Sequence, residues 1–334
     1  MEKNMPRVTL KMLSERTGLA VSTISEILNA KPNYCSPETR KYVLDTASEL
    51  GYTPNLGFRL MTGRDTATAA ILYSQRRVLF DEHNQTLALL LLESLEKQKR
   101  SAYTVVLSIS PQENIARIRE LISRGCREFF FLGAPMGDRE IYDLLKKEKL
   151  KRANFNSFNA DGKSILIDFR YICERFVDCF QAENISPCCL FTQTHFDRYA
   201  KEVFISRGLD PESHFIEVED HGHIQQDCFQ LSYDRTFRAI DSYVKRASAS
   251  RTGWICMSDC DAMGALAALR KNDLPIFHNG IPLVCGFGNS SYSRLSVLPV
   301  NSVDLKLKDV ANFMLSSENT PRTYLPDIII KKGF

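Results

Sequence analysis

The chain has 334 residues, of which 44% are hydrophobic and 25% are charged. This length and composition exclude a disordered protein and predict two or three domains with buried cores. The net charge of +3 is too small to indicate nucleic-acid binding by itself. The excess of positive over negative residues is confined to residues 1–64, which hold nine Lys and Arg against six Asp and Glu.

No apolar run approaches the roughly 20 residues that span a bilayer, and the first residues do not form a secretory signal. We therefore expect a cytoplasmic protein with no membrane contact. The ten cysteines lack the paired spacing and the His partners of a structural zinc site. They are expected to be reduced and mostly buried thiols.

The first predicted element is a short helix over about residues 10–17. Thr9 is its candidate N-cap, and Gly18 can adopt the left-handed conformation that ends a helix. A second helix follows, in which Ile24, Ile27 and Leu28 recur at helical spacing and are expected to point inward. Two short helices joined by a tight turn predict a helix-turn-helix, whose second helix enters the DNA major groove.

The third predicted helix opens at Ser36, with Pro37 at its first position, and closes at Gly51. Together the three helices supply a minimal core. Its expected members are Leu10, Leu13, Ile24, Leu28, Val43 and Ala47. The alternative for this head is a helical bundle without a DNA role.

These segments match, in order and spacing, the head of a known family. The matching residues are Val8 to Leu10, Ser22 to Ser25, Leu28-Asn29, Ser36 to Arg40 and Leu50 to Asn55. The chain therefore resembles the lactose repressor (LacI/GalR) family of bacterial transcription regulators, and weaker matches continue to residues 325–333. The resemblance implies a helix-turn-helix domain at 1–54, a hinge helix and linker at 55–68, and an effector-binding and dimerisation domain at 69–334.

The resemblance also implies which residues meet DNA. Val21, Ser22 and Glu26 fall at base-reading positions. The positions that contact phosphate or support such contacts fall on Thr9, Thr23, Ser25 and Asn29. Asn55 and Met61 lie in the hinge, where Met61 would wedge into the minor groove, although an ordinary flexible linker is the alternative.

Two residues depart from the family pattern in the second helix. Ala20 replaces a capping Ser, which should weaken the helix start by about 1 kcal/mol. Glu26 replaces a residue that is commonly Arg, and a carboxylate accepts a hydrogen bond from cytosine N4 instead of donating to guanine. We therefore expect an operator that differs from the common one.

From Thr68 onward, short apolar runs alternate with helical segments, which predicts parallel sheets covered on both faces. The resemblance implies a periplasmic-binding-protein-like sensor, an α/β fold of two doubly wound lobes. The first lobe is expected at about 69–160 with a late segment near 291–320. The second is expected at about 161–290 with the C-terminal end.

Ligands bind such sheets beyond the carboxyl ends of the strands. Ser74 and Arg76 follow the first expected strand, and the remaining effector positions come from the resemblance. They are Asn156, Arg198, Ser258, Asp259 and Asn289, each with an ordinary loop role as its alternative. Gly288 stands where sugar-binding members often have Asp, so convergence of Arg76, Arg77 and Arg198 would favour an anionic ligand.

The sequence offers little for catalysis. It contains no P-loop, GxSxG or HExxH motif. Asp259 and Asp261 are more simply explained as helix-start residues, and His221 and His223 as part of a solvated acidic loop instead of a metal site. We expect no enzyme activity, no catalytic residue, no cofactor and no metal.

The sequence therefore predicts a transcription regulator controlled by a small effector, a carbohydrate or related metabolite, with repression as the expected mode. A homodimer or higher assembly would bind a pseudo-palindromic operator in double-stranded DNA, because linked heads gain effective concentration. The alternative is a cytoplasmic small-molecule binding protein with a degenerate head. A carbohydrate-processing enzyme is a third alternative, and it lacks a candidate acid and base.

Overall fold

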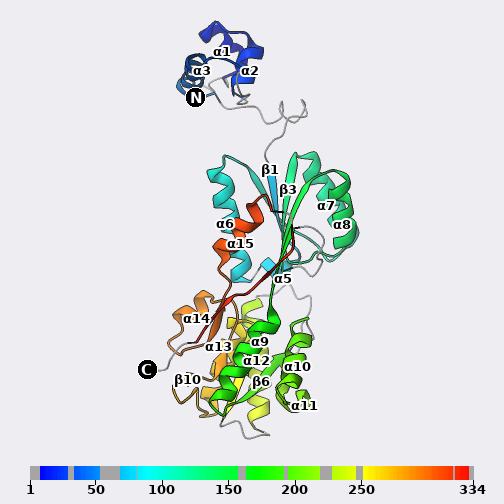
Figure 1. Cartoon of the computed structure of the whole chain (residues 1–334), viewed down its shortest axis with the longest axis vertical. Helices are drawn as coiled ribbons and strands as arrows, with labels where there is room; N and C mark the ends of the chain where they lie inside the picture. Colours follow the sequence, from blue (N-terminus) through cyan, green and yellow to red (C-terminus); the bar gives the residue numbers. More distant parts are fainter. Residues whose placement is uncertain are drawn as a thin grey trace, which may run out of the picture. The chain divides into compact units, whose positions relative to one another are not determined.

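The computed structural model describes residues 8–28, 34–52, 68–79, 81–156, 163–191, 195–218, 228–245, 251–318 and 320–330. The predicted DNA-binding residues Asn29, Asn55 and Met61 lie outside these ranges. The chain divides into two units, Met1–Thr66 and Ala67–Phe334 (Figure 1). Within the described ranges, no helix is both long and apolar enough to cross a membrane.

The first unit contains α1 (Leu10–Thr17), α2 (Val21–Leu28) and α3 (Pro37–Glu49). The predicted start and end of the first helix are confirmed. The Thr9 side chain accepts a hydrogen bond from the Met12 amide, and Gly18 has a φ of 72°. This left-handed glycine turns the chain sharply between α1 and α2.

The core of this head is small and consists of residues from all three helices. Its buried members are Leu13, Ile24, Ile27, Val43 and Ala47. Leu10 and Leu28, which we expected in the core, are half-buried and pack against it, and Ile27 is nearly inaccessible. Each helix thus contributes one apolar face to the core. Because the core has only these few buried residues, each face is needed for the head to be stable.

The second unit begins with a six-stranded sheet in the order β13-β5-β4-β3-β1-β2, in which every pair is parallel. Its strands are β1 (Thr68–Tyr73), β2 (Ala102–Val106), β3 (Cys126–Leu132), β4 (Lys151–Phe155), β5 (Lys163–Ile167) and β13 (Arg322–Tyr324). Apolar residues of α6 (Glu82–Lys97) and α15 (Leu307–Leu315) cover one face. Those of α7 (Pro111–Ser123) and α8 (Asp138–Lys147) cover the other. We call this sheet with its helices the first lobe.

A four-stranded parallel sheet in the order β11-β8-β6-β7 forms the second lobe. Its strands are β6 (Ser186–Phe191), β7 (Phe215–Glu217), β8 (Thr252–Ile255) and β11 (Val284–Cys285). One face packs on α9 (Phe169–Ala182) and α10 (His195–Ser206). The opposite face packs on α12 (Cys228–Val244) and α13 (Asp259–Lys271). The predicted α/β fold with two doubly wound lobes is confirmed.

Shorter elements complete the second unit. The short helices are α5 (Arg76–Leu79), α11 (Pro211–His214) and α14 (Ser291–Leu295). The antiparallel pairs are β9 (Phe277–His278) with β10 (Ile281–Pro282), and β12 (Ser302–Asp304) with β14 (Asp327–Ile329). The β12–β14 pair joins two late parts of the chain.

The expected boundary between the lobes is wrong at three places. The late segment that we expected in the first lobe, near 291–320, begins with α14, whose N-cap residue Ser290 bonds to Asp259 of α13 in the second lobe. We expected the second lobe from about residue 161, but β5 pairs with β4 and β13 and belongs to the first sheet. We also placed the C-terminal end in the second lobe, but β13 is an edge strand of the first. A short apolar run predicts a buried strand without specifying the sheet that the strand joins.

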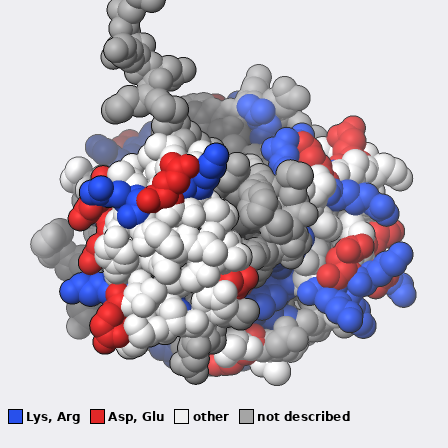
Figure 2. Space-filling model, turned by 90° about the horizontal axis from the view of Figure 1, so that it is seen from above, with Lys and Arg blue, Asp and Glu red and all other residues white. Residues whose placement is uncertain are grey.

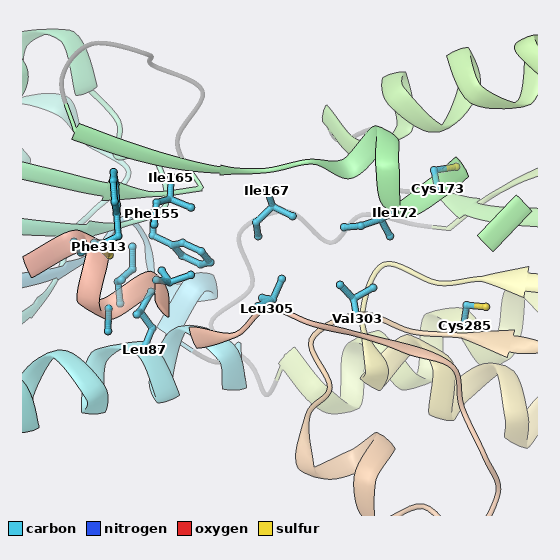
Figure 3. Close-up of a cluster of buried hydrophobic side chains, with 14 of the residues drawn as sticks. Leu87, Phe155, Ile165, Ile167, Ile172, Cys173, Cys285, Val303, Leu305 and Phe313 are labelled. Carbon is cyan, nitrogen blue, oxygen red and sulfur yellow. The ribbon is translucent and has the colours of Figure 1, made fainter. Parts of the chain in front are cut away.

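A buried apolar cluster continues from one lobe into the other (Figure 3). In the first lobe it includes Leu87, Phe155, Ile165 and Phe313, and in the second Ile172, Cys173 and Cys285. Between these groups lie Ile167, Val303 and Leu305. Because this cluster is continuous, the strand ends of the two sheets are held close to a common site.

The cysteines behave as buried apolar residues. Nine of them are described, all as free thiols, and six are buried. Burial raises the pKa of Cys173 and of Cys188 to about 12. These thiols are therefore protonated near neutral pH. The expectation that most of the cysteines are buried is confirmed for the nine described.

Candidate functional site

The outer face of α2 is the candidate DNA interface. Val21 and Ser22 are exposed, Val21 to 42%, while Ile24 and Ile27 face the core. Thr23, Ser25 and Glu26 are half-buried at the margins of this face. Thr9, just before α1, is exposed. Of the three side chains that the family resemblance assigns to base reading, Val21 and Ser22 thus occupy the outward side of the helix and Glu26 lies at its margin.

Several hydrogen bonds hold α2 in the head. The Ser14 hydroxyl donates to the Leu19 carbonyl at 2.6 Å, across the turn. The Arg40 guanidinium donates to the Ile27 carbonyl at 3.5 Å, which places a positive charge at the negative end of the helix dipole. At the other end, the Ala20 carbonyl accepts from Ile24 at 3.0 Å, but its methyl side chain supplies no cap. The helix is therefore fixed by its core face and by its neighbours instead of by an N-cap side chain.

The charge distribution is mixed. Figure 2 shows Lys and Arg side chains interspersed with Asp and Glu on the face that it draws, beside broad uncharged areas. This agrees with the small net charge of +3. A net charge of +3 gives only weak non-specific attraction to phosphate, so specific contacts must contribute more of any affinity for DNA.

The predicted effector residues lie beyond strand ends of both lobes. Ser74 follows β1 and Asn156 follows β4 in the first lobe. Ser258 and Asp259 lie beyond β8, and Asn289 beyond β11, in the second. The carboxyl ends of these strands are where an α/β sheet binds ligands.

Four aromatic rings meet at these strand ends, and we call them the ring cluster: His83, Phe155, Phe169 and Phe287. The His83 ring centroid lies 6.3 Å from that of Phe155 and 5.9 Å from that of Phe287, both edge to face. Phe169 and Phe287 lie 5.8 Å apart. Because His83 and Phe155 belong to the first lobe and Phe169 and Phe287 to the second, the ring cluster joins the two lobes.

Burial lowers the pKa of His83 below its ordinary value of 6.5, although Asp81, Asp259 and Glu82 oppose this shift. The imidazole is therefore neutral near pH 7. Its Nε2 accepts a hydrogen bond from the Asn84 side-chain amide at 3.1 Å, so Nδ1 carries the proton and is the nitrogen that can donate. Sequence reasoning missed the ring cluster. Phe287 lay in a segment that carried the resemblance, but His83 has no local signal beyond its place in the first turn of α6.

Asn156, directly after Phe155, has a side-chain oxygen without a hydrogen-bond donor among the described residues. Its backbone has a φ of 53°, and its amide donates to the Ile165 carbonyl at 2.7 Å. The side-chain Oδ1 is buried and accepts no hydrogen bond from the part of the chain that the structure describes. An unmatched buried acceptor costs about 1–3 kcal/mol, so this oxygen favours a ligand or solvent donor.

Asp259 is engaged within the protein and does not face a ligand as we expected. Its buried carboxylate accepts four hydrogen bonds: from the Ser290 amide at 2.6 Å, and from the hydroxyls of Ser290, Ser293 and Ser302 at 2.7–2.8 Å. Gly286 makes room for it, because a Cβ at that position would lie 2.3 Å from Oδ1. Asp259 therefore positions the chain that follows β11.

Ser258 is likewise engaged. Its side chain caps α13 by accepting from the Asp261 amide at 3.1 Å, and its hydroxyl donates to the Asp261 carboxylate at 2.8 Å. Asp261 also pairs with Arg235 at 3.1 Å. The preference for a helix-start role over catalysis is thus supported by these bonds. Asn289 has a φ of 45°, and its amide donates to the Ser302 hydroxyl.

The expected convergence of arginines does not occur among the described side chains. Arg198 is 81% exposed on α10, with its Nε 3.3 Å from a Glu202 carboxylate oxygen. Arg76 is exposed on α5, in the other lobe. Ser74 is only 2% exposed, beneath Gly133, whose added Cβ would lie 2.5 Å from the Ser74 hydroxyl oxygen. The argument for an anionic ligand therefore loses its basis.

No group of three or more His, Cys, Asp or Glu side chains within the described ranges is arranged to hold a metal ion. His221 and His223, the weaker metal candidates, lie outside those ranges. What the strand ends hold is the buried ring of Phe155, the partly buried rings of Phe169 and Phe287, a neutral imidazole and an unmatched amide oxygen. This chemistry suits an uncharged polar ligand with an apolar face.

No protein-family model matches the chain. A curated relative, the HTH-type transcriptional regulator RegA of Clostridium saccharobutylicum, is 26% identical over 283 residues, which cover 80% of this chain and 79% of RegA. A structure of the Lac repressor dimer bound to operator and the anti-inducer ONPF matches with a TM-score of 0.77 and 13% identity, covering 98% and 99% of the two chains. The CelR–cellobiose complex matches with a TM-score of 0.63 and 16% identity, covering 98% and 100%.

The molecule thus has the architecture of a helix-turn-helix regulator, with a helical head and a two-lobe sensor of parallel sheets. Its fold is that of the Lac repressor over nearly the whole chain, and its curated relatives are HTH-type transcriptional regulators. The resemblance to the lactose repressor family is confirmed.

Proposed function

We propose that this protein is a sequence-specific DNA-binding transcription regulator whose operator affinity is controlled by a small molecule at the ring cluster. The observation that carries the proposal is α2, a helix with a buried apolar side and an outward side of small polar residues, in a head with this fold. The Lac repressor neighbour is described as a dimer bound to operator. We extend that assembly to this chain, with each head of a dimer on one half of a pseudo-palindrome.

Within the interface, Val21, Ser22 and Glu26 would read bases. Phosphate contacts or their support would fall to Thr9, Thr23, Ser25 and Asn29, while Asn55 and Met61 would act in the hinge. The exposed positions of Val21 and Ser22 support this assignment. Glu26 at the margin of the face would accept from cytosine N4.

The effector would be an uncharged carbohydrate or related compound. The CelR neighbour is described as a cellobiose complex, and in the ring cluster the partly buried rings of Phe169 and Phe287 lie near polar atoms. Of the residues predicted from the sequence, Asn156 and Asn289 keep the best support. We withdraw four residues as direct ligand contacts. Arg198 is too exposed and Ser74 too buried. The side chains of Ser258 and Asp259 are occupied by hydrogen bonds within the protein.

The effector would act by changing the relation between the two lobes and so the arrangement of the paired heads. Such control requires that the ligand bind one lobe arrangement more tightly than the other. We further propose that the protein acts in the cytoplasm and catalyses no reaction. The support for this is that its curated relatives are transcriptional regulators.

The experiment is selection of duplexes from a random pool by the full-length protein at moderate salt. The expected result is a pseudo-palindromic site preferred over bulk DNA. Recovery of no preferred duplex, together with tight binding of a sugar, would favour the rival function, a small-molecule binding protein with a degenerate head.

Variants then sort the contacts within the head. Glu26→Gln should change base preference at one position of each half-site, while Thr9→Ala should weaken all sequences alike. Because Thr9 also caps α1, Thr9→Ser, which retains a cap, is its matched control. Equal losses on every sequence from both variants would contradict the division between base reading and phosphate contact.

A further inference from the structure

The lobes are joined by a carboxylate as well as by rings. Glu82, the first residue of α6 in the first lobe, accepts hydrogen bonds from the Ser291 amide at 2.8 and 3.0 Å and from the Ser291 hydroxyl at 2.6 Å. The Arg294 guanidinium lies 3.4 Å from the same carboxylate. Ser291 and Arg294 belong to α14, more than 200 residues further along the chain.

The helix α14 is a part of the second lobe that depends on outside acceptors. It has five residues, and its N-cap residue Ser290 makes no side-chain cap bond. Instead, the amide and hydroxyl of Ser290 donate to Asp259, at the start of α13. The N-terminus of α14 is thus held by two carboxylates, Asp259 from its own lobe and Glu82 from the other. Removing Glu82 should release the bond between the lobes without detaching α14 from α13.

This bond lies next to the ring cluster. His83 directly follows Glu82 and contacts Phe287 of the second lobe, while the segment between Phe287 and Ser291 includes Gly288, whose added Cβ would lie 3.7 Å from the His83 Nδ1. A ligand that separates His83 from Phe287 by moving the start of α6 would therefore also shift Glu82 relative to α14, because the two residues are neighbours on that helix.

We infer that Glu82 is a positioning residue that fastens the first lobe to α14 and favours the lobe arrangement with higher operator affinity. This inference rests on the proposed function. An ordered relation between the lobes favours a fixed spacing of the paired heads, whereas release of the bond admits other spacings. A ligand bound at the ring cluster would weaken the hydrogen bonds between Glu82 and Ser291.

The test compares full-length wild type with Glu82→Ala, Glu82→Gln and Ser291→Ala. Amide hydrogen exchange at Ser291 reports the bond itself, and affinity for the duplex from the random-pool selection reports its consequence. We expect at least tenfold faster exchange at Ser291 in Glu82→Ala, and about fivefold weaker duplex binding. Glu82→Gln retains an acceptor oxygen, so its exchange rate and its duplex affinity should lie between those of wild type and Glu82→Ala. The double variant of Glu82→Ala and Ser291→Ala should bind the duplex as Glu82→Ala does.

Two controls separate positioning from general damage. Glu96→Ala removes an exposed carboxylate from the same helix and should change neither readout. Fluorescence of Trp254, buried in the second lobe, should give the same urea midpoint within error for Glu82→Ala and wild type. Unchanged exchange at Ser291 would overturn the inference, and so would changed exchange with unchanged or tighter duplex binding. If wild type itself selects no duplex, the proposed function fails and the regulatory inference fails with it, while exchange still decides whether the bond exists.

Discussion

Asp259 offers the sharpest test of how the second lobe is built. Its buried carboxylate satisfies four donors, of which the Ser290 amide has a fixed direction and three are hydroxyls that can turn. Asp259→Ala leaves all four without their acceptor. A stranded buried amide costs about 1–3 kcal/mol, and hydroxyls that lose charge-assisted bonds add to this even when they find new partners.

We therefore expect Asp259→Ala to lower the free energy of unfolding by about 3–5 kcal/mol. Asp259→Asn should cost less, about 1–2 kcal/mol. The remaining oxygen can take the place of Oδ2, which accepts three of the four bonds. The amide nitrogen would face the Ser302 hydroxyl, which already accepts from the Asn289 amide and would have to turn its hydrogen away to accept a second bond. What is lost is the acceptor of that one hydroxyl and the strength that the negative charge gives to the other bonds.

The assay is urea unfolding followed by the fluorescence of Trp254, the single tryptophan, which is fully buried in β8 five residues before Asp259. Asp273→Asn is the matched control. It neutralises an exposed carboxylate nearby and keeps a residue that tolerates the local φ of 52°. A loss below about 1 kcal/mol for Asp259→Ala would refute the reasoning, because it would mean that water replaces the carboxylate at no cost.

Three further variants test other parts of the structure. Ile27→Ala should destabilise the head by about 2–5 kcal/mol and lower duplex affinity while leaving the Trp254 transition unchanged; equal loss of both transitions in calorimetry would contradict this. Gly264→Ala places a Cβ 2.3 Å from the Tyr233 carbonyl oxygen and should cost about 3 kcal/mol by forcing α12 from α13; an unchanged urea midpoint would show that the helices adjust freely. The pKa of His83 in the folded protein is below 6.5, so the unfolded chain binds the proton first and the free energy of unfolding decreases as pH falls below 6.5. His83→Gln should make the decrease in the free energy of unfolding between pH 7.5 and 5 smaller. Identical pH dependence in wild type and variant would count against a lowered pKa for His83.

The head was predictable from sequence because its signals are local. Thr9, Gly18 and Ser36 each form a capping hydrogen bond with a residue three or four positions away. The apolar spacing of α2 determines which side of that helix faces the core. The sensor was predictable only in outline. The strand β4 begins with Lys151 and Arg152 and therefore lacks an apolar pattern. Arg152 is nevertheless half-buried, with a side chain only 6% exposed, because it pairs with Asp138 and lies 4.7 Å from the Phe131 ring centroid.

The effector site could not be assembled from sequence for a similar reason. The donors to Asp259 lie 31 to 43 positions along the chain, so its carboxylate looked available when it is already satisfied. The ring cluster draws on four separate segments, and the role of each ring depends on the other three. Family resemblance located the strand ends correctly, whereas the side chains that meet there depend on the tertiary structure.

The central claim is that the outward face of α2 reads a particular DNA sequence. The most direct measurement is fluorescence anisotropy of the full-length protein with its selected duplex and with a scrambled duplex of equal length, at one physiological salt concentration. We expect the selected duplex to bind at least about a thousandfold more tightly than the scrambled one, and Ser22→Ala to reduce this ratio of affinities. Equal affinity for the two duplexes would show that α2 does not read a DNA sequence.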